Sequence, residues 1–190
     1  MKNNMNNKIL VCNKKDINLY KINEKDNIFF ELEFIISNPN IIIKNVVNFK
    51  LFELMAELNK DIIEKQIIIN TEDNYIDLLI TFNKFSDDLG INKQYYSTRT
   101  TLIEFDDKTV FSSNNINIDK NKIDLDFSRY NLIKDSNKVL EFNYLNTNTM
   151  KCKYNFSMAI DEDLPSYMEN MLGLLMKKVF FRLKTFIENI

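Results

Sequence analysis

The chain has 190 residues, 45% of them hydrophobic, and a net charge of −2, which suits one domain with a full core. A nucleic-acid-binding surface normally shows a basic excess, so the near-neutral charge argues against that class of partner. The sequence contains no histidine, and it therefore lacks the commonest catalytic base and metal ligand.

No segment predicts secretion or a membrane span. The start, MKNNMNNK, has no apolar run after its basic residue, so residues 1–8 are expected to be a frayed lead and not a secretory signal. No apolar run approaches the ~18 residues of a spanning helix. Cys12 and Cys152 are isolated, which favours two reduced thiols over a disulfide and predicts no metal site. We expect an intracellular protein, in the cytoplasm or an organelle interior.

The first third of the chain predicts strands and one helix. Short strands are expected at Ile9 to Val11 and Ile17 to Ile22. The alternation of large apolar residues with glutamates in Ile28 to Ile36 predicts a half-buried strand. A helical period follows from Ile43 to Leu58.

The middle of the chain predicts antiparallel strands joined by short polar connectors. We expect them at Ile62 to Ile69, Tyr75 to Phe82, Tyr95 to Phe105, Thr109 to Ser112, Ile123 to Phe127, Arg129 to Ile133, Lys138 to Leu145 and Met150 to Ile160. The loop from Lys84 to Gln94 contains Gly90, which permits a positive φ. This loop is either a lid or a plain connector.

The last stretch, Pro165 to Ile190, predicts a long helix with an unusually wide apolar arc. Pro165 suits the first turn, and Ser166 with Glu169 forms a capping box. The elements together predict an α+β fold: a curved antiparallel sheet of about six to seven strands around a long C-terminal helix, with a short helix after the first clear strand. No second domain is visible, so 1–190 is expected to be a single domain.

The end of the chain resembles the START-like superfamily, the helix-grip (SRPBCC, Bet v 1-type) proteins. The likeness lies in the strand KYNFSMAI, the acidic step Asp161-Glu162-Asp163, the turn Leu164-Pro165 and the amphipathic helix that follows. The helix, with Gly173 before an apolar and basic run, is most similar to an uncharacterised START-related family of cyanobacteria and plastids. The resemblance spans about residues 28 to 190.

The resemblance implies a sheet that grips the terminal helix, with a cavity between them for an apolar ligand. One flank of the helix would then face the sheet and another the ligand. A core filled by side chains explains the same apolar arc without a ligand, and this alternative stays open.

Candidate ligand-binding residues lie on one strand and on the terminal helix. Arg99 is the candidate for a phosphate or carboxylate headgroup, with Tyr95, Ser97 and Thr101 on the same face. The alternative is an arginine on the solvent side of the sheet, which the cost of an unpaired buried guanidinium favours. The helix candidates have the spacing of one face, which suits plain core equally well: Met168, Met171, Leu172, Leu175 and Val179.

Two charged clusters have simpler explanations than ligand binding. The acidic step before the helix is a candidate cation site, but helix-start electrostatics explains it. Lys177, Lys178, Arg182 and Lys184 form the most basic cluster. Peripheral contact with an anionic membrane is one interpretation, and a solvated face near the helix C-terminus is the simpler one.

The sequence predicts non-catalytic binding, and possibly transfer, of a hydrophobic small molecule, most plausibly a lipid. No cofactor and no nucleic-acid partner are predicted, and the oligomeric state is not indicated. The first alternative is an enzyme on the same scaffold, a cyclase or hydrolase that uses carboxylates such as Glu141 or Asp77. The second is an assembly protein with a filled interior.

Overall fold

The computed structural model describes residues 8–24, 27–83, 93–133, 137–157 and 166–190, with the main chain alone described at 23–24, 27–28 and 166–169. Residues 84–92 of the loop predicted from Lys84 to Gln94, the acidic step at 161–163 and the turn at 164–165 lie outside these residues, whereas Lys93 and Gln94 begin a strand. The predicted lead also lies outside them, except for Lys8, which is the first residue of a strand.

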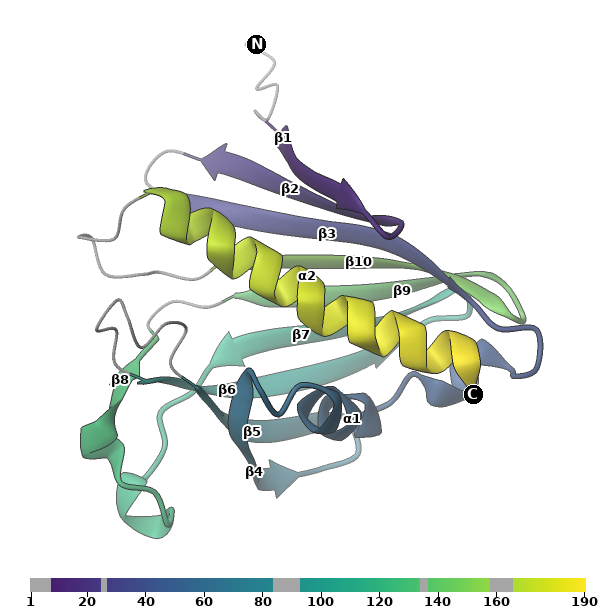
Figure 1. The fold of residues 1–190 in the computed structure, drawn as a ribbon. Coiled ribbons are helices and arrows are strands. Elements are labelled where there is room, and N and C mark those ends of the chain that lie inside the picture. The colour runs from purple at the N-terminus through teal and green to yellow at the C-terminus, as the bar shows by residue number, and fades with distance from the viewer. Residues whose placement is uncertain (1–7, 25–26, 84–92, 134–136, 158–165) are drawn as a thin grey trace, which may run out of the picture.

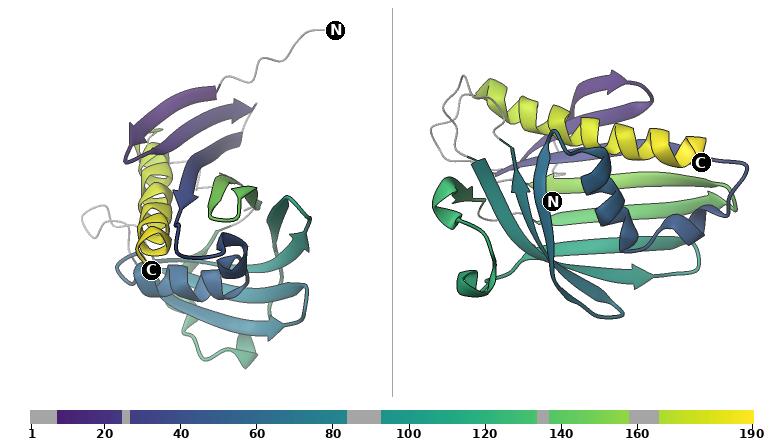
Figure 2. Two further views of the ribbon diagram at one scale, coloured as in Figure 1. Left: turned by 90° about the vertical axis from the view of Figure 1, so that its right-hand side faces the viewer. Right: turned by 60° about the horizontal axis from the view of Figure 1, so that its bottom comes forward.

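The described residues form one ten-stranded sheet in the order β1-β2-β3-β10-β9-β7-β6-β5-β4, with β8 paired to β6. The sheet curves around the long helix α2, and α1 lies beside that helix (Figures 1 and 2). The strands are β1 Lys8–Lys14, β2 Ile17–Glu24, β3 Asn27–Ser37, β4 Ile63–Thr71, β5 Tyr75–Phe82, β6 Lys93–Glu104, β7 Lys108–Asn115, β8 Tyr130–Leu132, β9 Lys138–Asn146 and β10 Thr149–Ser157. The helices are α1 Lys50–Leu58 and α2 Ser166–Asn189, with short 3-10 turns at Ile43–Val46, Lys120–Lys122 and Phe127–Arg129.

The predicted α+β class is confirmed, whereas the sheet is larger than predicted. β1 and β2 pair with each other and extend the sheet beyond β3. The predicted strand from Ile123 to Phe127 is wrong, because this stretch runs between two 3-10 turns without strand pairing. The predicted helix from Ile43 to Leu58 is divided into a 3-10 turn and α1.

The short connectors predicted antiparallel strands, and among the described strands one pair is parallel. β8 runs parallel to β6, with Lys93 opposite Tyr130 and Tyr95 opposite Leu132. β7 pairs with β6 only from Thr98 onward. β8 therefore occupies the edge of β6 that β7 leaves unpaired.

The middle of the sheet is held together by β3 and β10, which are far apart in sequence. Leu32 lies opposite Tyr154, and Phe34 opposite Cys152. The inward side chains of both strands meet α2, since Phe34 and Tyr154 contact the Phe180 ring at centroid distances of 5.8 and 4.6 Å. The period of two in each strand thus builds a continuous aromatic layer under the helix.

The C-terminal end of α2 is fixed by Asn38, in the turn after β3. The Asn38 Nδ2 donates to the carbonyl oxygens of Ile187 and Ile190, at 2.7 and 2.9 Å. The last carbonyls of a helix have no partner within the helix. A buried amide on another element supplies one here, and it fixes where α2 ends on the sheet.

Candidate functional site

A cavity of about 60 Å³ lies between the sheet, α1 and α2. β4 to β7, β9 and β10 supply the sheet wall, and the two helices close it from the other side. The lining residues are Ile63 and Gln66 (β4), Leu78, Ile80 and Phe82 (β5), Tyr96, Thr98 and Thr100 (β6), Phe111 and Ser113 (β7), Lys138 and Leu140 (β9), Tyr154 (β10), Phe52 and Met55 (α1), and Met176, Val179 and Phe180 (α2).

The volume sets a limit on what this cavity holds as it stands. It has room for a few water molecules, whereas pockets for small ligands are typically ~300–1,000 Å³. Aromatic side chains fill much of the space beneath α2: Phe111 packs edge-on against both Phe52 and Phe142. The interior is thus intermediate between the open cavity and the filled core that the sequence left as alternatives.

A polar row crosses the sheet wall of this cavity. Thr100 on β6 lies opposite Ser113 on β7, and Ser113 lies opposite Lys138 on β9. The Thr100 and Ser113 hydroxyl oxygens are 2.8 Å apart. Thr98 lines the cavity as well and donates its hydroxyl hydrogen to the Asn114 carbonyl oxygen at 2.9 Å.

Lys138 is the basic residue in the lining, and only 8% of its surface is exposed. Its Nζ lies 3.1 Å from the centroid of the Tyr96 ring, close enough for a cation–π contact. Burial lowers the pKa of the Lys138 amine well below its ordinary value. Burial also raises the pKa of the Tyr96 and Tyr154 phenols, so both remain protonated donors at neutral pH.

The sequence missed Lys138, although its strand carried the signal. In the expected strand from Lys138 to Leu145, Leu140 and Phe142 are the apolar residues of one face, and period-two alternation adds Lys138 to that face. Because Lys138 is charged, it indicated the polar start of the strand. The alternation of the strand, however, places it on the interior face.

The predicted strand candidates lie on the face of β6 opposite the cavity. The even-numbered residues from Tyr96 to Thr100 line the cavity, so Tyr95, Arg99 and Thr101 point the other way. Of the two placements considered for Arg99, the structure therefore has the one on the solvent side of the sheet, where 46% of its side chain is exposed. A shift of one residue exchanges the two faces of a strand, and the mixed composition of this strand did not reveal which was which.

The partners of Arg99 lie on the outer face of the sheet. Its Nε and Nη2 donate to the two carboxylate oxygens of Asp77, at 2.7 and 2.8 Å. Its guanidinium also stacks over the Tyr75 ring at 4.0 Å. Tyr95 packs edge-on against Phe127. These residues stabilise the outer side of the sheet, and their predicted ligand contact is not tested by this arrangement.

One of the predicted helix candidates, Val179, lines the cavity. Leu172 and Leu175 are partly buried outside the lining, and Met171 is 44% exposed. Met168 belongs to the part of α2 whose side chains are not described. Met176 and Phe180 line the cavity instead, because only the middle of α2 crosses the strands that form the cavity wall.

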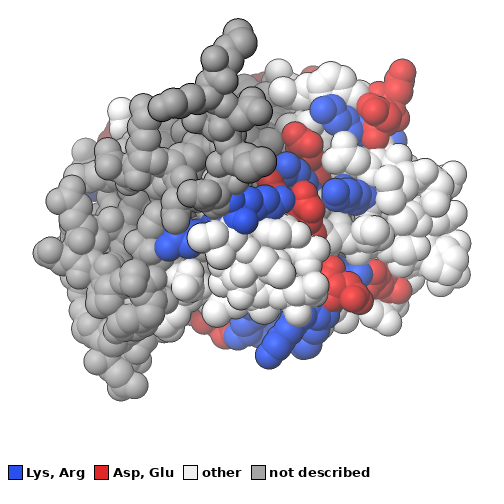
Figure 3. All heavy atoms as spheres, turned by 90° about the horizontal axis from the view of Figure 1, so that it is seen from above, with Lys and Arg blue, Asp and Glu red and all other residues white. Residues whose placement is uncertain are grey.

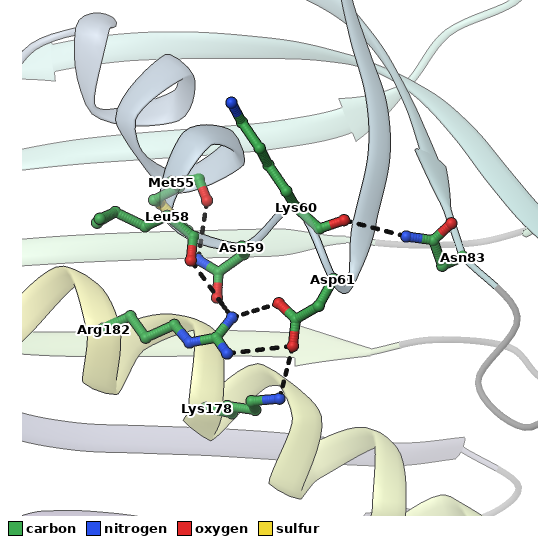
Figure 4. A network of polar contacts seen from close by, with 8 residues as sticks. All are labelled: Met55, Leu58, Asn59, Lys60, Asp61, Asn83, Lys178 and Arg182. Atoms are coloured by element: carbon green, nitrogen blue, oxygen red, sulfur yellow. Dashed lines mark hydrogen bonds and ion pairs between the residues drawn. The ribbon is translucent and has the colours of Figure 1, made fainter.

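A network of polar contacts, here called the polar clasp, joins the end of α1 and the turn after it to α2 (Figure 4). It consists of Asp61, in the turn between α1 and β4, and of Lys178 and Arg182 on α2. The Lys178 Nζ donates to Asp61 Oδ2 at 2.7 Å, and Arg182 binds both carboxylate oxygens of Asp61. Arg182 and Lys178 hold the pKa of the Asp61 carboxyl well below its ordinary range.

The clasp also reaches the end of α1. Arg182 Nη1 donates to Asn59 Oδ1 at 3.0 Å and to the Leu58 carbonyl oxygen at 3.3 Å. Asn59 Nδ2 in turn donates to the carbonyl oxygen of Met55, at 2.8 Å. Since Met55 lines the cavity, these contacts connect α2 to a residue of the cavity wall.

Each member of the basic cluster predicted on α2 has a partner within the protein. Lys178 and Arg182 belong to the clasp. Lys184 donates to the Ile35 carbonyl oxygen at 2.6 Å and pairs with Glu188. The buried Lys177 contacts the Cys12 sulfur at 3.1 Å. On the face of the molecule in Figure 3, the drawn basic and acidic side chains are interspersed among uncharged ones.

Other predicted features concern catalysis, metals and membranes. Neither Glu141 nor Asp77, the carboxylates of the enzyme alternative, lines the cavity. Among the described residues, no three cysteine or acidic side chains gather as they would around a metal ion. Cys12 and Cys152 are free thiols. Neither helix, within its described residues, has the length and apolar character to cross a bilayer.

Comparison with known proteins gives matches at the level of structure. Comparison of the sequence with protein-family profiles gives no match, and comparison with curated proteins gives none either. A STAR-related lipid transfer protein from Xanthomonas axonopodis is similar in structure, with a TM-score of 0.67 and 11% identity, over 95% of this chain and 96% of that one. The human StarD13 lipid transfer and protein localization domain has a TM-score of 0.73 and 7% identity, over 97% of this chain and 91% of its own.

A more distant likeness is to the Zhui aromatase/cyclase from Streptomyces, with a TM-score of 0.50 and 10% identity, over 84% of this chain and 90% of that one. Identities this low establish the arrangement of elements and nothing finer. The large antiparallel sheet and the long terminal helix of this chain are the architecture that the structural matches share. The chain therefore has the START-like helix-grip fold.

Proposed function

We propose that the protein binds a hydrophobic small molecule, most plausibly a lipid, between its sheet and α2, without catalysing a reaction. The observation that carries this proposal is the cavity itself, which lies where the sheet, α1 and α2 meet and has a predominantly apolar lining. Two proteins of similar fold are named for lipid transfer, which supports the same class of ligand. Transfer between membranes would be a further step of this binding.

The small volume means that ligand binding must enlarge the cavity. Phe52, Met55 and Met176 are lining residues on the two helices, and methionine side chains adapt readily to irregular space. The α1 side is the natural place for expansion, because α1 is short. The polar contacts of the clasp hold its end, and they would have to open as the helix moves. We expect the ligand to displace these side chains as α1 moves outward.

The enzyme alternative has weaker support than binding. A carboxylate mechanism needs an acidic group at the cavity, and the described lining contains none. One protein of similar fold is an aromatase/cyclase. A reaction in the interior of the present protein would have to rely on groups other than carboxylates. The assembly alternative requires an interior that binds no ligand.

Native mass spectrometry of freshly purified protein tests the proposal. A co-purified mass of lipid size, or such a mass after incubation with lipid extract, is the expected result. Protein that stays free of adducts under both conditions would contradict ligand binding and would favour a filled interior.

A matched pair of variants tests whether the ligand occupies this cavity. Met176→Trp puts a large ring at the cavity wall and should reduce lipid occupancy at least severalfold. Met171→Trp makes the same change at an exposed position of the same helix and should leave occupancy unchanged. The native chain has no tryptophan, so the fluorescence of each variant also reports its environment. Equal occupancy in both variants would place the ligand elsewhere.

A further inference from the structure

Cys12 and Lys177 form a pair of reactive side chains away from the cavity, which neither of them lines. Cys12 lies on β1 opposite the buried Leu19 of β2, so its side chain is on the face of the sheet toward α2. The Lys177 Nζ lies 3.1 Å from the Cys12 Sγ. Only 8% of the surface of Lys177 is exposed, and in the described part of the chain the sulfur is the one hydrogen-bond partner of this amine. A buried amine is thus directed at a thiol.

The contacts on either side of this pair hold the two groups together. One turn before Lys177 on α2, Gly173 packs against Leu19 so closely that a β-carbon would lie 3.1 Å from its Cδ2. One turn after Lys177, the Phe181 ring lies 3.9 Å from the amine of Lys15, in the turn between β1 and β2. The β1–β2 hairpin is therefore fixed to one face of α2 on both sides of the pair. Two groups that are held in this way react with a high effective concentration.

The second cysteine of the chain lies too far from Cys12 to form a disulfide in this fold. Cys152 is on β10, and β2 and β3 lie between β10 and β1. Three steps of ~4.8 Å between neighbouring strands separate the two cysteines by ~14 Å along the sheet, well beyond the ~7 Å that a disulfide spans between α-carbons. If Cys12 is oxidised, the amine of Lys177 is therefore the nucleophile at hand.

We propose that Cys12 and Lys177 form a site of oxidative modification, at which hydrogen peroxide joins the sulfur and the nitrogen in a sulfenamide bond. Cys12 is partly exposed, so a molecule as small as peroxide can reach its sulfur. The bond ties the hairpin at the edge of the sheet to α2. It also keeps Cys12 from further oxidation to the sulfinic acid, which is generally irreversible.

The reaction has two steps. In the first, the sulfur attacks peroxide and the O–O bond breaks; one oxygen forms the sulfenic acid and the other leaves as water. In the second, the neutral Lys177 amine attacks that sulfur, and the S–O bond breaks as the hydroxyl group leaves as water with a proton from the amine. The sulfur is oxidised by two electrons and the peroxide is reduced by two. Sulfenic acids condense with backbone nitrogen in the same way.

Intact-mass spectrometry of the full chain after treatment with a small molar excess of hydrogen peroxide tests the proposal. The product should be about 2 Da lighter than the untreated protein, because two hydrogens are lost and no oxygen is retained. Dithiothreitol should restore the original mass. Proteolytic digestion should give two peptides joined through Cys12 and Lys177. Because a disulfide would give the same change in mass, Cys152→Ser is the control for that bond, and it should show the same loss.

A matched pair of lysine variants tests whether Lys177 supplies the nitrogen. Lys177→Arg keeps the positive charge but presents a guanidinium, which stays protonated. This variant should lose the cross-link and should gain about 16 or 32 Da at Cys12. Lys14→Met changes an exposed lysine two residues from Cys12 on the same strand, and it should form the cross-link as the wild type does.

Three results would overturn the proposal. The first is the addition of oxygen at Cys12 of the wild type with no joined peptides, and the second is a Cys12 that remains a thiol under peroxide. The third is a cross-link that forms equally in Lys177→Arg, since another nitrogen would then supply the bond. The first two are read from the wild type and do not depend on whether any variant folds. None of the three bears on ligand binding.

Discussion

Lys138 brings an amine into an interior that is otherwise built mainly from aliphatic and aromatic side chains. A charged amine is poorly solvated in such a place, and the residue therefore lowers its pKa on folding. Because the pKa of this lysine differs between the folded and unfolded states, the stability of the protein depends on pH through this residue.

The first prediction is that the stability of Lys138→Met relative to the wild type increases as the pH falls below the ordinary lysine pKa of about 10.4. Over that range the unfolded wild type binds its proton more readily than the folded state does, and this difference favours unfolding. The advantage of the variant should shrink as the pH rises toward that value, by at most about 1.4 kcal/mol per pH unit. Urea unfolding of both proteins between about pH 7 and 10.5 measures it.

The comparison of two proteins removes the main complication of alkaline pH. The same tyrosines and cysteines titrate in wild type and variant, so their contributions to the free energy of unfolding cancel in the difference. Lys151→Met, at an exposed position of β10, should show a small difference that hardly varies with pH. A stability difference for Lys138→Met that is constant across the range would contradict the inferred pKa.

At the scale of the elements, α2 lies in close contact with β3 and β2 at Gly173. A β-carbon at this position would lie 2.9 Å from two ring carbons of Phe30 and 3.1 Å from Leu19 Cδ2. The Phe30 ring is buried and stacked on Phe156, with ring centroids 5.4 Å apart, so it has little room to yield. The glycine is needed for this close approach.

We therefore predict that Gly173→Ala destabilises the protein by about 1–3 kcal/mol, the usual cost of overpacking. Helix propensity alone would favour alanine by about 1 kcal/mol, so the sign of the change distinguishes packing from propensity. The free energy of unfolding from urea titration is the measurement. In a Phe30→Leu background the same substitution should cost less. A stabilising Gly173→Ala would show that the helix lies farther from β3.

For the whole molecule, the local sequence patterns predicted many of the strands. They did not predict which strands pair with each other when these are far apart in sequence. The alternation in β3 and β10 predicted two strands, but nothing within either segment indicated that Leu32 would lie opposite Tyr154. The pairing of β1 with β2 was equally hidden, because each is short and polar at its ends. Such pairings depend on how the apolar faces of all the strands and helices pack together in one core.

The sequence indicated where an interior would lie, but few of the residues that line it. The wide apolar arc of the terminal helix indicated an interior between helix and sheet, and Val179 lines that interior. The sequence did not show which face of β6 lies toward the interior, because polar residues occupy both of its faces. The Asp61 clasp joins a turn to α2 across more than a hundred residues, and no local pattern indicates such a contact.

At the level of the whole fold, the clasp joins the end of α1 to α2 across more than a hundred residues of sequence. Asp61 stays ionised across the neutral range because Arg182 and Lys178 lower its pKa. Its contribution to stability is therefore complete above the ordinary aspartate pKa of about 3.9 and is lost only as the pH falls below it, through the folded-state value. At neutral pH a substitution is needed to loosen the clasp.

We predict that Asp61→Asn raises hydrogen exchange in α1 about two- to fivefold at neutral pH, as the loss of ~0.5–1 kcal/mol from a partly exposed ion-pair network implies. Amides of β3 and β10 should be unaffected, because their hydrogen bonds do not depend on α1. Glu57→Gln removes a carboxylate of α1 that pairs only with Lys60 among the described residues, and it should leave exchange in α1 nearly unchanged. Faster exchange throughout the sheet would mean that the clasp supports the fold as a whole, and unchanged exchange in α1 would mean that apolar packing alone holds the helix.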